Sequence, residues 1–482
     1  MSPLASFKIC RHPESSFDGS FNLPSTFYAI PLPKQGESFL LRTAHNGEDV
    51  NIIVDAGWGD QFPLSRGALT SFLTNNVPDI KVIHRFVITH EDGDHCQGAS
   101  QFIEDWLSSG GSIEQVWLPA HWSITAGAPL DRGYERSEII YKEALRAAPK
   151  ILEKLRQLTE RTRGADEEGQ RLQDGQNDLG ANMLVEAVVL AANEDGGLDD
   201  LYQEKSDDAS ANCIDDLLRR LPEPWLRRSR YHPQTDVLEI RREVEEEALS
   251  MARQQRREWG QVDRLATYLT MAVIDTHEKM APTIAACIHH GIMIRWFDFK
   301  AFANHKPNPA PSGGDPGVLV PVNAREVQPS SKPLSITSVF YALALTVANR
   351  ESLVFYRPED PDKEPPVLFT ADSRLKLRHT AYPAPAGLSG RQRLLATAPH
   401  HASSNNHQAY AVMKVWLPPT SYPPIFVRNG GWKVSAVAAD FRAAVGRQCV
   451  RCVPSPDQAS LVRFEALAGG WQDLAHPKPC SC

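Results

Sequence analysis

The sequence predicts an α/β protein interrupted by a large helical insertion. Short apolar runs bounded by turn residues fill roughly the first 130 residues and return after about residue 285, which is typical of buried strands. Between these two parts, apolar residues recur at helical spacing in 139–158 and again in 237–274. Polar and ionisable residues follow directly after several strands, where α/β proteins often gather their functional groups.

The chain has 482 residues, too many for one ordinary core. We expect the first half of a fold in 1–130, a helical insertion in 131–285, the second half in 286–430 and a cysteine-containing tail in 431–482. Within the insertion, residues 160–216 carry 16 acids and 4 basic residues, and their weak apolar patterning predicts a mobile segment. The total charge is −8, so the rest of the chain carries +4 and does not exclude a nucleic-acid partner.

Membrane association is not expected. The longest apolar run, near 339–348, is about half of the roughly 18 residues that a membrane span requires. The N-terminus lacks the charged and apolar regions of a signal peptide, and eight cysteines in a chain this long do not form a disulfide scaffold. These features predict a cytoplasmic protein.

A cluster of histidines and acids lies in the stretch VITHEDGDHCQG, residues 87–98. The apolar run 82–88 leads into it and a helical pattern follows from Ala99, so the cluster occupies a strand-to-helix turn. It supplies two nitrogens and two carboxylates, enough to begin a two-metal site, from His90, Asp92, Asp94 and His95. The alternative is a polar loop with Asp94 as the helix N-cap, which explains one acid and neither histidine.

The remaining strands are justified in chain order. Buried strands at 36–42 and 51–57 flank a polar turn, and the second places Asp55 near its end. Strand 116–119 precedes His121, and further strands are expected at 291–297, 318–322 and 335–347. Strand 352–356 begins at Ser352, just after Asn349. Strand 367–372 ends at Asp372, and strand 394–398 leads to His400, His401 and Ser403.

This order of motifs resembles the metallo-β-lactamase superfamily, and more narrowly the soluble nuclease domain of ComEC-type DNA-uptake proteins. Those domains carry a glycine-acid strand like Gly36-Glu37-Ser38, a His-x-Asp-x-Asp-His turn, an Asn-x-x-Ser-x-Val strand, a strand ending in Gly-Asp and a His-His-Gly-Ser turn. The resemblance covers roughly 25–125 and 285–410. Ala371 and Ala402 stand where glycine is usual, and one glycine follows Gln97 where a pair is common.

The resemblance implies an αββα four-layer sandwich with a two-metal site. In it, His90 and Asp92 hold one metal while Asp94 and His95 hold the other. Asp372 bridges the two ions, and either His400 or His401 completes one ligand shell. The expected catalytic residues are His90, Asp94 and Asp372, with Asp94 also orienting the attacking water. A carboxylate at Asp92, where most members have histidine, favours Mn²⁺ or Mg²⁺, although Zn²⁺ is also compatible.

Other residues are expected to support the site or the fold. Asp55, Asn349, Ser352 and Ser403 are expected beside the ligands, with turn capping as the alternative for Asp55. For His121 we expect a surface or supporting position, the alternative being a third histidine ligand. Four cysteines near the C-terminus could close a structural zinc site or remain free thiols: Cys449, Cys452, Cys480 and Cys482.

The expected function is a metal-dependent nuclease that cleaves DNA. Five arginines with Trp225 and Tyr231 in 217–231 could contact phosphates and stack on a base, and the alternative is a solvated helix end and turn. The acidic segment 160–216 could occupy the substrate groove and hold the enzyme inactive, and the alternative is a solvated acidic loop. Defence modules pair similar nucleases with proteases, which suggests an antiviral role and a protease or other defence-system partner. The alternatives are a hydrolase of a small ester, lactone or cyclic nucleotide, and a non-catalytic regulatory subunit of a partner complex.

Overall fold

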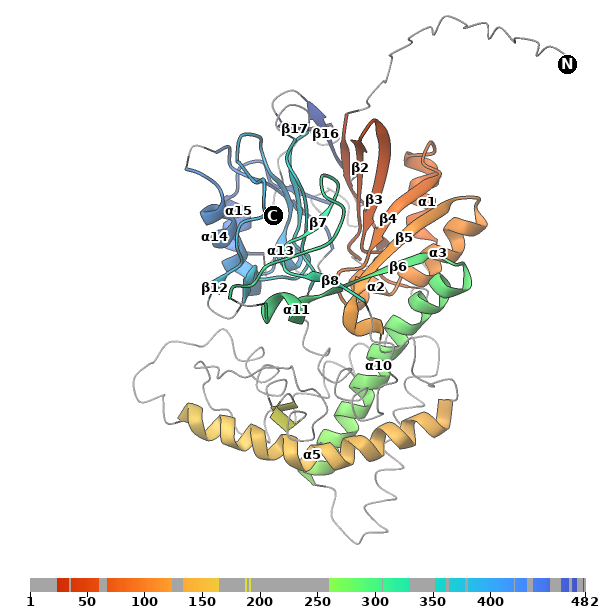
Figure 1. Cartoon of the computed structure of the whole chain (residues 1–482), viewed down its shortest axis with the longest axis vertical. Coiled ribbons are helices and arrows are strands. Elements are labelled where there is room, and N and C mark those ends of the chain that lie inside the picture. Colours follow the sequence, from red (N-terminus) through yellow and green to blue (C-terminus); the bar gives the residue numbers. More distant parts are fainter. Residues whose placement is uncertain are drawn as a thin grey trace, which may run out of the picture.

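The computed structural model describes two sheets, the helices around them and two long helices that extend away from them (Figure 1). The described residues are 24–33, 36–59, 67–123, 133–163, 187–188, 190–191, 260–305, 307–328, 352–360, 364–377, 380–419, 421–430, 437–450, 461–467, 470–474 and 480. The strand expected at 335–347 and most of the acidic segment lie outside these ranges.

The first sheet has nine strands in the order β17-β16-β1-β2-β3-β4-β5-β6-β8. Their bounds are β1 (Thr26–Ala29), β2 (Phe39–His45), β3 (Glu48–Val54), β4 (Val82–Val87), β5 (Ser112–Pro119), β6 (Met293–Asp298), β8 (Arg325–Val327), β16 (Val462–Leu467) and β17 (Gly470–Asp473). Strands β3 to β6 run parallel, so their carboxyl ends meet at one edge. Because β5 pairs directly with β6, the sheet continues across the insertion.

The second sheet has six strands in the order β15-β14-β13-β10-β9-β7. Their bounds are β7 (Val320–Pro321), β9 (Phe355–Arg357), β10 (Val367–Phe369), β13 (Leu395–Thr397), β14 (Ile425–Arg428) and β15 (Gln448–Cys449). Strands β10, β13, β14 and β15 are parallel. A small hairpin follows β10, formed by β11 (Lys376–Leu377) and β12 (Thr380–Ala381).

Three apolar clusters place the sheets face to face with helices outside them. Along β2, Phe39 and Leu41 face the second sheet, while Leu40 faces the helices. The rings of Phe27 and Phe369 lie 6.0 Å apart across the two sheets. Helices α1 (Ala68–Asn76), α3 (Ala99–Ser108), α5 (Gly133–Arg163) and α10 (Gln261–His289) share the outer cluster of the first sheet; α11 (Phe299–Ala303), α14 (His407–Trp416) and α15 (Ala439–Ala443) share that of the second. The predicted α/β class is therefore confirmed.

Two sequence-based boundaries differ from the structure. The helical insertion predicted to end at residue 285 runs on to His289 in α10, because apolar positions continue at Met280, Ile284 and Cys287. Residues expected as a tail beyond the fold instead form β15, β16 and β17 and complete the edges of both sheets. In Figure 1, α5 crosses below the body, and α10 runs back from it to pack against α3.

No helix among the described residues is long and apolar enough to cross a bilayer.

Candidate metal centre

Five turns after strands converge on one site between the two sheets. Asp55 follows β3, the turn 88–95 follows β4, Asp372 follows β10, His400 and His401 follow β13, and Asn429 follows β14. All five strands are parallel members of their sheets, and the carboxyl ends of parallel strands gather at one edge. This topology brings together residues that lie more than 300 positions apart in the chain.

The histidine-acid turn is held by backbone contacts with two neighbouring loops. The amide of Glu37 donates to the Asp94 carbonyl at 2.7 Å, and the amide of Ala56 donates to the His95 carbonyl at 2.7 Å. Gly36 has to be glycine, because a Cβ there would lie 2.6 Å from the Cα of Gly57. The short helix α2 (Gly93–Cys96) has Asp92 at its N-cap position, so the alternative role of Asp94 as N-cap is wrong.

Three hydrogen bonds identify which nitrogen of each buried histidine is free to bind a metal. Asp55 accepts from Nδ1 of His95 at 2.8 Å, and also from the hydroxyl of Thr89. Because the Thr89 proton goes to Asp55, its oxygen accepts from Nδ1 of His90, 2.9 Å away. Both neutral rings therefore carry their proton on Nδ1 and present a bare Nε2, which is the form that ligates metals.

The two bare nitrogens face the carboxylate of Asp372. His90 Nε2 lies 3.6 Å from Oδ2 and His95 Nε2 lies 3.4 Å from Oδ1, so each nitrogen faces a different oxygen of one carboxylate. Among the described residues, both Nε2 atoms and Asp372 Oδ1 are buried without a hydrogen-bond partner. Buried polar atoms are rarely left unsatisfied, so lone pairs converging in this way point to a cation between them. The residues present therefore fit a bound metal.

Both histidines after β13 face the cluster, on different sides. His400 Nε2 lies 3.4 Å from Oδ2 of Asp372, the oxygen nearest to His90. His401 Nε2 lies 3.1 Å from Oδ2 of Asp94. The sequence left open which of the two completes a shell; the structure brings both to the site, one beside each group of ligands.

The turn that presents these histidines is strained. His400, His401 and Ala402 all have positive φ, at 50°, 52° and 65°, and Ala371 has φ 44°. Left-handed backbone costs an L-residue about 1–2 kcal/mol. Ala371 and Ala402 thus both occupy the backbone conformation that favours glycine. Strain of this kind is common where a fold must aim side chains into a site.

The buried histidines and carboxylates of the cluster shift one another's pKa values. Burial disfavours the charged form of His95, but the carboxylates of Asp372 and Asp55 outweigh it and raise its pKa well above the usual value. Burial alone would raise the pKa of Asp372, but the nearby rings of His400, His95 and His90 bring it well below its usual value. In the absence of metal, protons on the histidines therefore balance the carboxylates.

Two groups of residues could hold metal ions. Ligand atoms of His90, His95 and Asp372 lie within 4.8 Å of one another, as do those of Glu37, His95 and His401. Asp92 lies at the rim of the first group, 3.9 Å from His90 Nε2. The side chains of Asp92, Asp94 and His400 are 16%, 25% and 38% exposed, whereas the other ligands are buried. The cluster is therefore in contact with solvent at these three residues.

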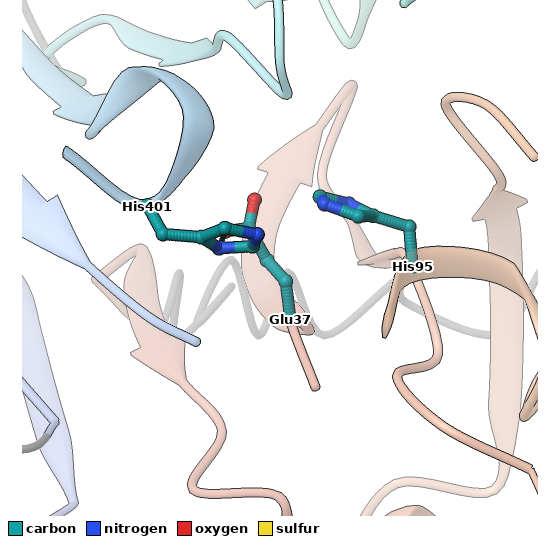
Figure 2. Close-up of side chains that lie close together, drawn as sticks. All are labelled: Glu37, His95 and His401. Carbon is teal, nitrogen blue, oxygen red and sulfur yellow. Dashed lines mark ion pairs between the residues drawn. The ribbon is translucent and has the colours of Figure 1, made fainter. Parts of the chain in front are cut away.

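Three residues near the site were not among the predicted ligands or supports. Glu37 is buried against His401, with its carboxylate 2.8 Å from Nδ1 (Figure 2). Glu91, inside the turn itself, lies 3.4 Å from Nε2 of His121. Asn429 accepts from His401 Nδ1 through its carbonyl at 2.9 Å. Glu37 belonged to a recognisable glycine-acid motif, but nothing in the sequence indicated its contact with a histidine 364 positions away.

The predicted supporting residues are placed as follows. Asp55 lies directly behind His95 and Thr89. Ser352 is buried, and its carbonyl accepts from the side-chain amide of Asn323 at 2.8 Å. Ser403 follows the histidine turn and forms an isolated antiparallel β-bridge with Val437. Asn349 lies outside the described residues.

The cysteines of the predicted structural zinc site are only partly described. Cys449 and Cys480 are both buried in the outer cluster of the second sheet. Cys452 and Cys482 lie outside the described residues, so the structural zinc site stays a prediction.

No protein-family model matches the chain, and no curated protein matches it.

Proposed function

We propose that this chain is a two-metal hydrolase of phosphodiester bonds, a nuclease that cleaves DNA, on a metallo-β-lactamase type of αββα sandwich. The fold assignment is supported by the paired sheets with helices outside each, and by ligands at the carboxyl ends of strands in both sheets. The order of the proposed ligands along the chain also matches the sequence resemblance, which further supports this assignment.

One observation carries the proposal: buried, bare imidazole nitrogens face the two oxygens of Asp372. We assign the first metal position to His90, Asp92, Asp372 and His400. The second position takes Asp94, His95, His401 and the other oxygen of Asp372. This assignment uses every predicted ligand and gives both adjacent histidines a role.

The donor set favours a hard divalent ion. Three of the proposed ligands are the carboxylates Asp92, Asp94 and Asp372, and carboxylate-rich sites suit Mn²⁺ or Mg²⁺ better than histidine-only sites do. Two bound ions would activate water and stabilise charge on the phosphodiester oxygens. Asp94 is partly exposed beside His401, and in this proposal its carboxylate would orient the attacking water. Asp55 and Thr89 hold His95 and His90 in the ligating tautomer throughout.

The test is cleavage of plasmid and linear DNA with Mn²⁺, Mg²⁺ or Zn²⁺. His90→Ala and Asp372→Asn should each lower the cleavage rate by about 10³-fold or more, since each removes a metal ligand. The matched control is His290→Ala, because His290 pairs with Glu104 away from the site. Its rate should equal that of the unaltered chain.

Metal binding without DNA cleavage would contradict the nuclease and favour the hydrolase of a small ester, lactone or cyclic nucleotide. A chain that binds no metal would favour the regulatory subunit. The antiviral role and a protease or defence-system partner rest on the sequence resemblance alone and stay predictions.

A further inference from the structure

Glu37 is a fully buried carboxylate whose position the proposed mechanism does not yet use. Its side chain is 3% exposed, and it comes from the loop just before β2, in the first sheet. The ring it contacts, His401, belongs to the turn after β13 in the second sheet. Figure 2 shows Glu37 beside the ring of His401, with the ring of His95 on the other side of the same space.

The contacts of His401 fix the state of its ring. Nδ1 lies 2.8 Å from the Glu37 carboxylate and 2.9 Å from the Asn429 carbonyl, and both oxygens only accept hydrogen bonds. Nδ1 must therefore carry the proton. In the neutral ring, Nε2 is then a bare lone pair, and it faces the Asp94 carboxylate at 3.1 Å. Glu37 thus contacts Nδ1 of His401 in the same way that Asp55 contacts Nδ1 of His95.

The backbone of Glu37 acts on the same metal position as its side chain. The amide of Glu37 donates to the carbonyl of Asp94 at 2.7 Å, and this bond holds Asp94 opposite His401. Asn429 secures the loop in turn, because its side-chain amide donates to the carbonyls of Ile30 and Ser38 at 2.9 and 2.8 Å. One residue therefore holds two of the second position's ligands in register across the two sheets.

We propose that Glu37 is a positioning residue that assembles the second metal position through His401 and Asp94, without binding the metal itself. This rests on the metal centre of the proposed function but not on the choice of substrate. Carboxylates behind ligating histidines typically contribute 10- to 100-fold in metal affinity. Glu37→Gln keeps an oxygen that can accept from Nδ1 but loses the charge, and Glu37→Ala loses both.

The experiment is a Co²⁺ titration followed by calorimetry and by visible absorption. We expect the first ion to bind both variants as it binds the unaltered chain. The second should bind about 10-fold more weakly in Glu37→Gln and about 100-fold more weakly in Glu37→Ala. At saturating Co²⁺, Glu37→Gln should give the same spectrum as the unaltered chain, because the ligands are the same.

The matched control is Glu364→Gln. Glu364 is also a buried carboxylate, but it accepts from Ser25, Thr43 and Arg357 and lies outside the metal cluster. The Glu364→Gln variant should bind both ions with the affinity of the unaltered chain, even if its fold is less stable. Two ions bound with unchanged affinity in Glu37→Ala would overturn the inference alone. A changed spectrum at saturation in Glu37→Gln would overturn it by making Glu37 a ligand. An unaltered chain that binds no Co²⁺ would overturn both the inference and the proposed function.

Discussion

At the scale of single residues, the site is defined by hydrogen-bond direction more than by residue type. The sequence shows 16 histidines, and type alone does not separate a ligand from a structural ring. His84 illustrates the difference, because its Nδ1 accepts from the amide of Asn51 and the ring supports two strands. His90, His95 and His401 instead have acceptors at Nδ1, so their Nε2 atoms are left to face carboxylates.

Proton release on metal binding follows from the same contacts. Nearby carboxylates raise the pKa of His95 and of His401 well above the usual value, so we expect both rings to hold a second proton near pH 7 when no metal is bound. A metal needs the Nε2 lone pairs, so we expect uptake to release on the order of two protons per chain at pH 7. Calorimetry in two buffers of different ionisation enthalpy measures this number. His401→Gln should release about one proton fewer, and heats that do not depend on the buffer would contradict the expectation.

The same shifts set the pH dependence of the metal-free chain. A histidine whose folded pKa is raised stabilises the fold fully below its unfolded value, about 6.5, and loses that contribution as pH rises through the folded value. The metal-free chain should therefore be less stable at pH 9 than at pH 6. Metal affinity should change in the opposite direction, because protons compete for the same nitrogens. Urea unfolding at both pH values, with and without Mn²⁺, checks both signs.

At the scale of elements, the histidine-acid turn 88–95 depends on the close approach of the loop at Gly36 to the loop at Gly57. A Cβ on Gly36 would lie 2.6 Å from backbone, and no rotamer change relieves such a contact. Gly36→Ala should lower the free energy of unfolding by at least about 2 kcal/mol, and it should also weaken metal binding because Glu37 moves with it. Gly110→Ala is the control, since its Cβ meets nothing within 4 Å and only the positive φ of 87° is strained.

Gly110→Ala should cost about 1 kcal/mol and leave metal affinity unchanged. Urea unfolding and a Mn²⁺ titration of both variants make the comparison. If Gly36→Ala lost no more stability than Gly110→Ala and kept its metal affinity, the loop at Gly36 would not be what holds the site.

The sequence predicts an element correctly where a local pattern determines its structure. It does not predict features that depend on contacts between distant parts of the chain. Largely apolar runs ending in turn residues located β3, β4, β10 and β13, and every residue of β10 and β13 is buried. The choice between His400 and His401 could not be made, since the left-handed turn that aims both rings inward is a tertiary effect. Glu37 was missed for a similar reason, because its partner His401 belongs to the other sheet.

At the scale of the whole molecule, the acidic segment offers a test of regulation. Residues 192–216 contain nine acids and one lysine, and the mechanism predicted from sequence has such acids competing with DNA for the site. Deleting 192–216 should raise the rate of DNA cleavage at low salt by about tenfold or more. Replacing the nine acids by Asn and Gln is the matched control for charge and should give the same increase. Unchanged rates in both variants would rule out autoinhibition by charge.

The candidate metal ligands come from both sheets, so metal binding should stabilise the whole fold. His90, Asp94 and His95 come from the first sheet, while Asp372, His400 and His401 come from the second. A ligand that binds only the folded chain adds about 2.7 kcal/mol at a concentration 100 times its Kd, and about 4.1 kcal/mol at 1,000 times. Mn²⁺ should therefore raise the thermal unfolding midpoint in a concentration-dependent way, and both sheets should melt together.

Asp372→Asn should abolish most of this stabilisation, because Asp372 faces His90 of the first position and His95 of the second. Asp440→Asn changes an exposed acid on α15, outside the metal cluster, and should keep the full effect. Differential scanning calorimetry across a Mn²⁺ series measures all three chains. A midpoint that rises equally in Asp372→Asn would mean that the ion binds elsewhere, and the two sheets would then be held by their shared apolar core alone.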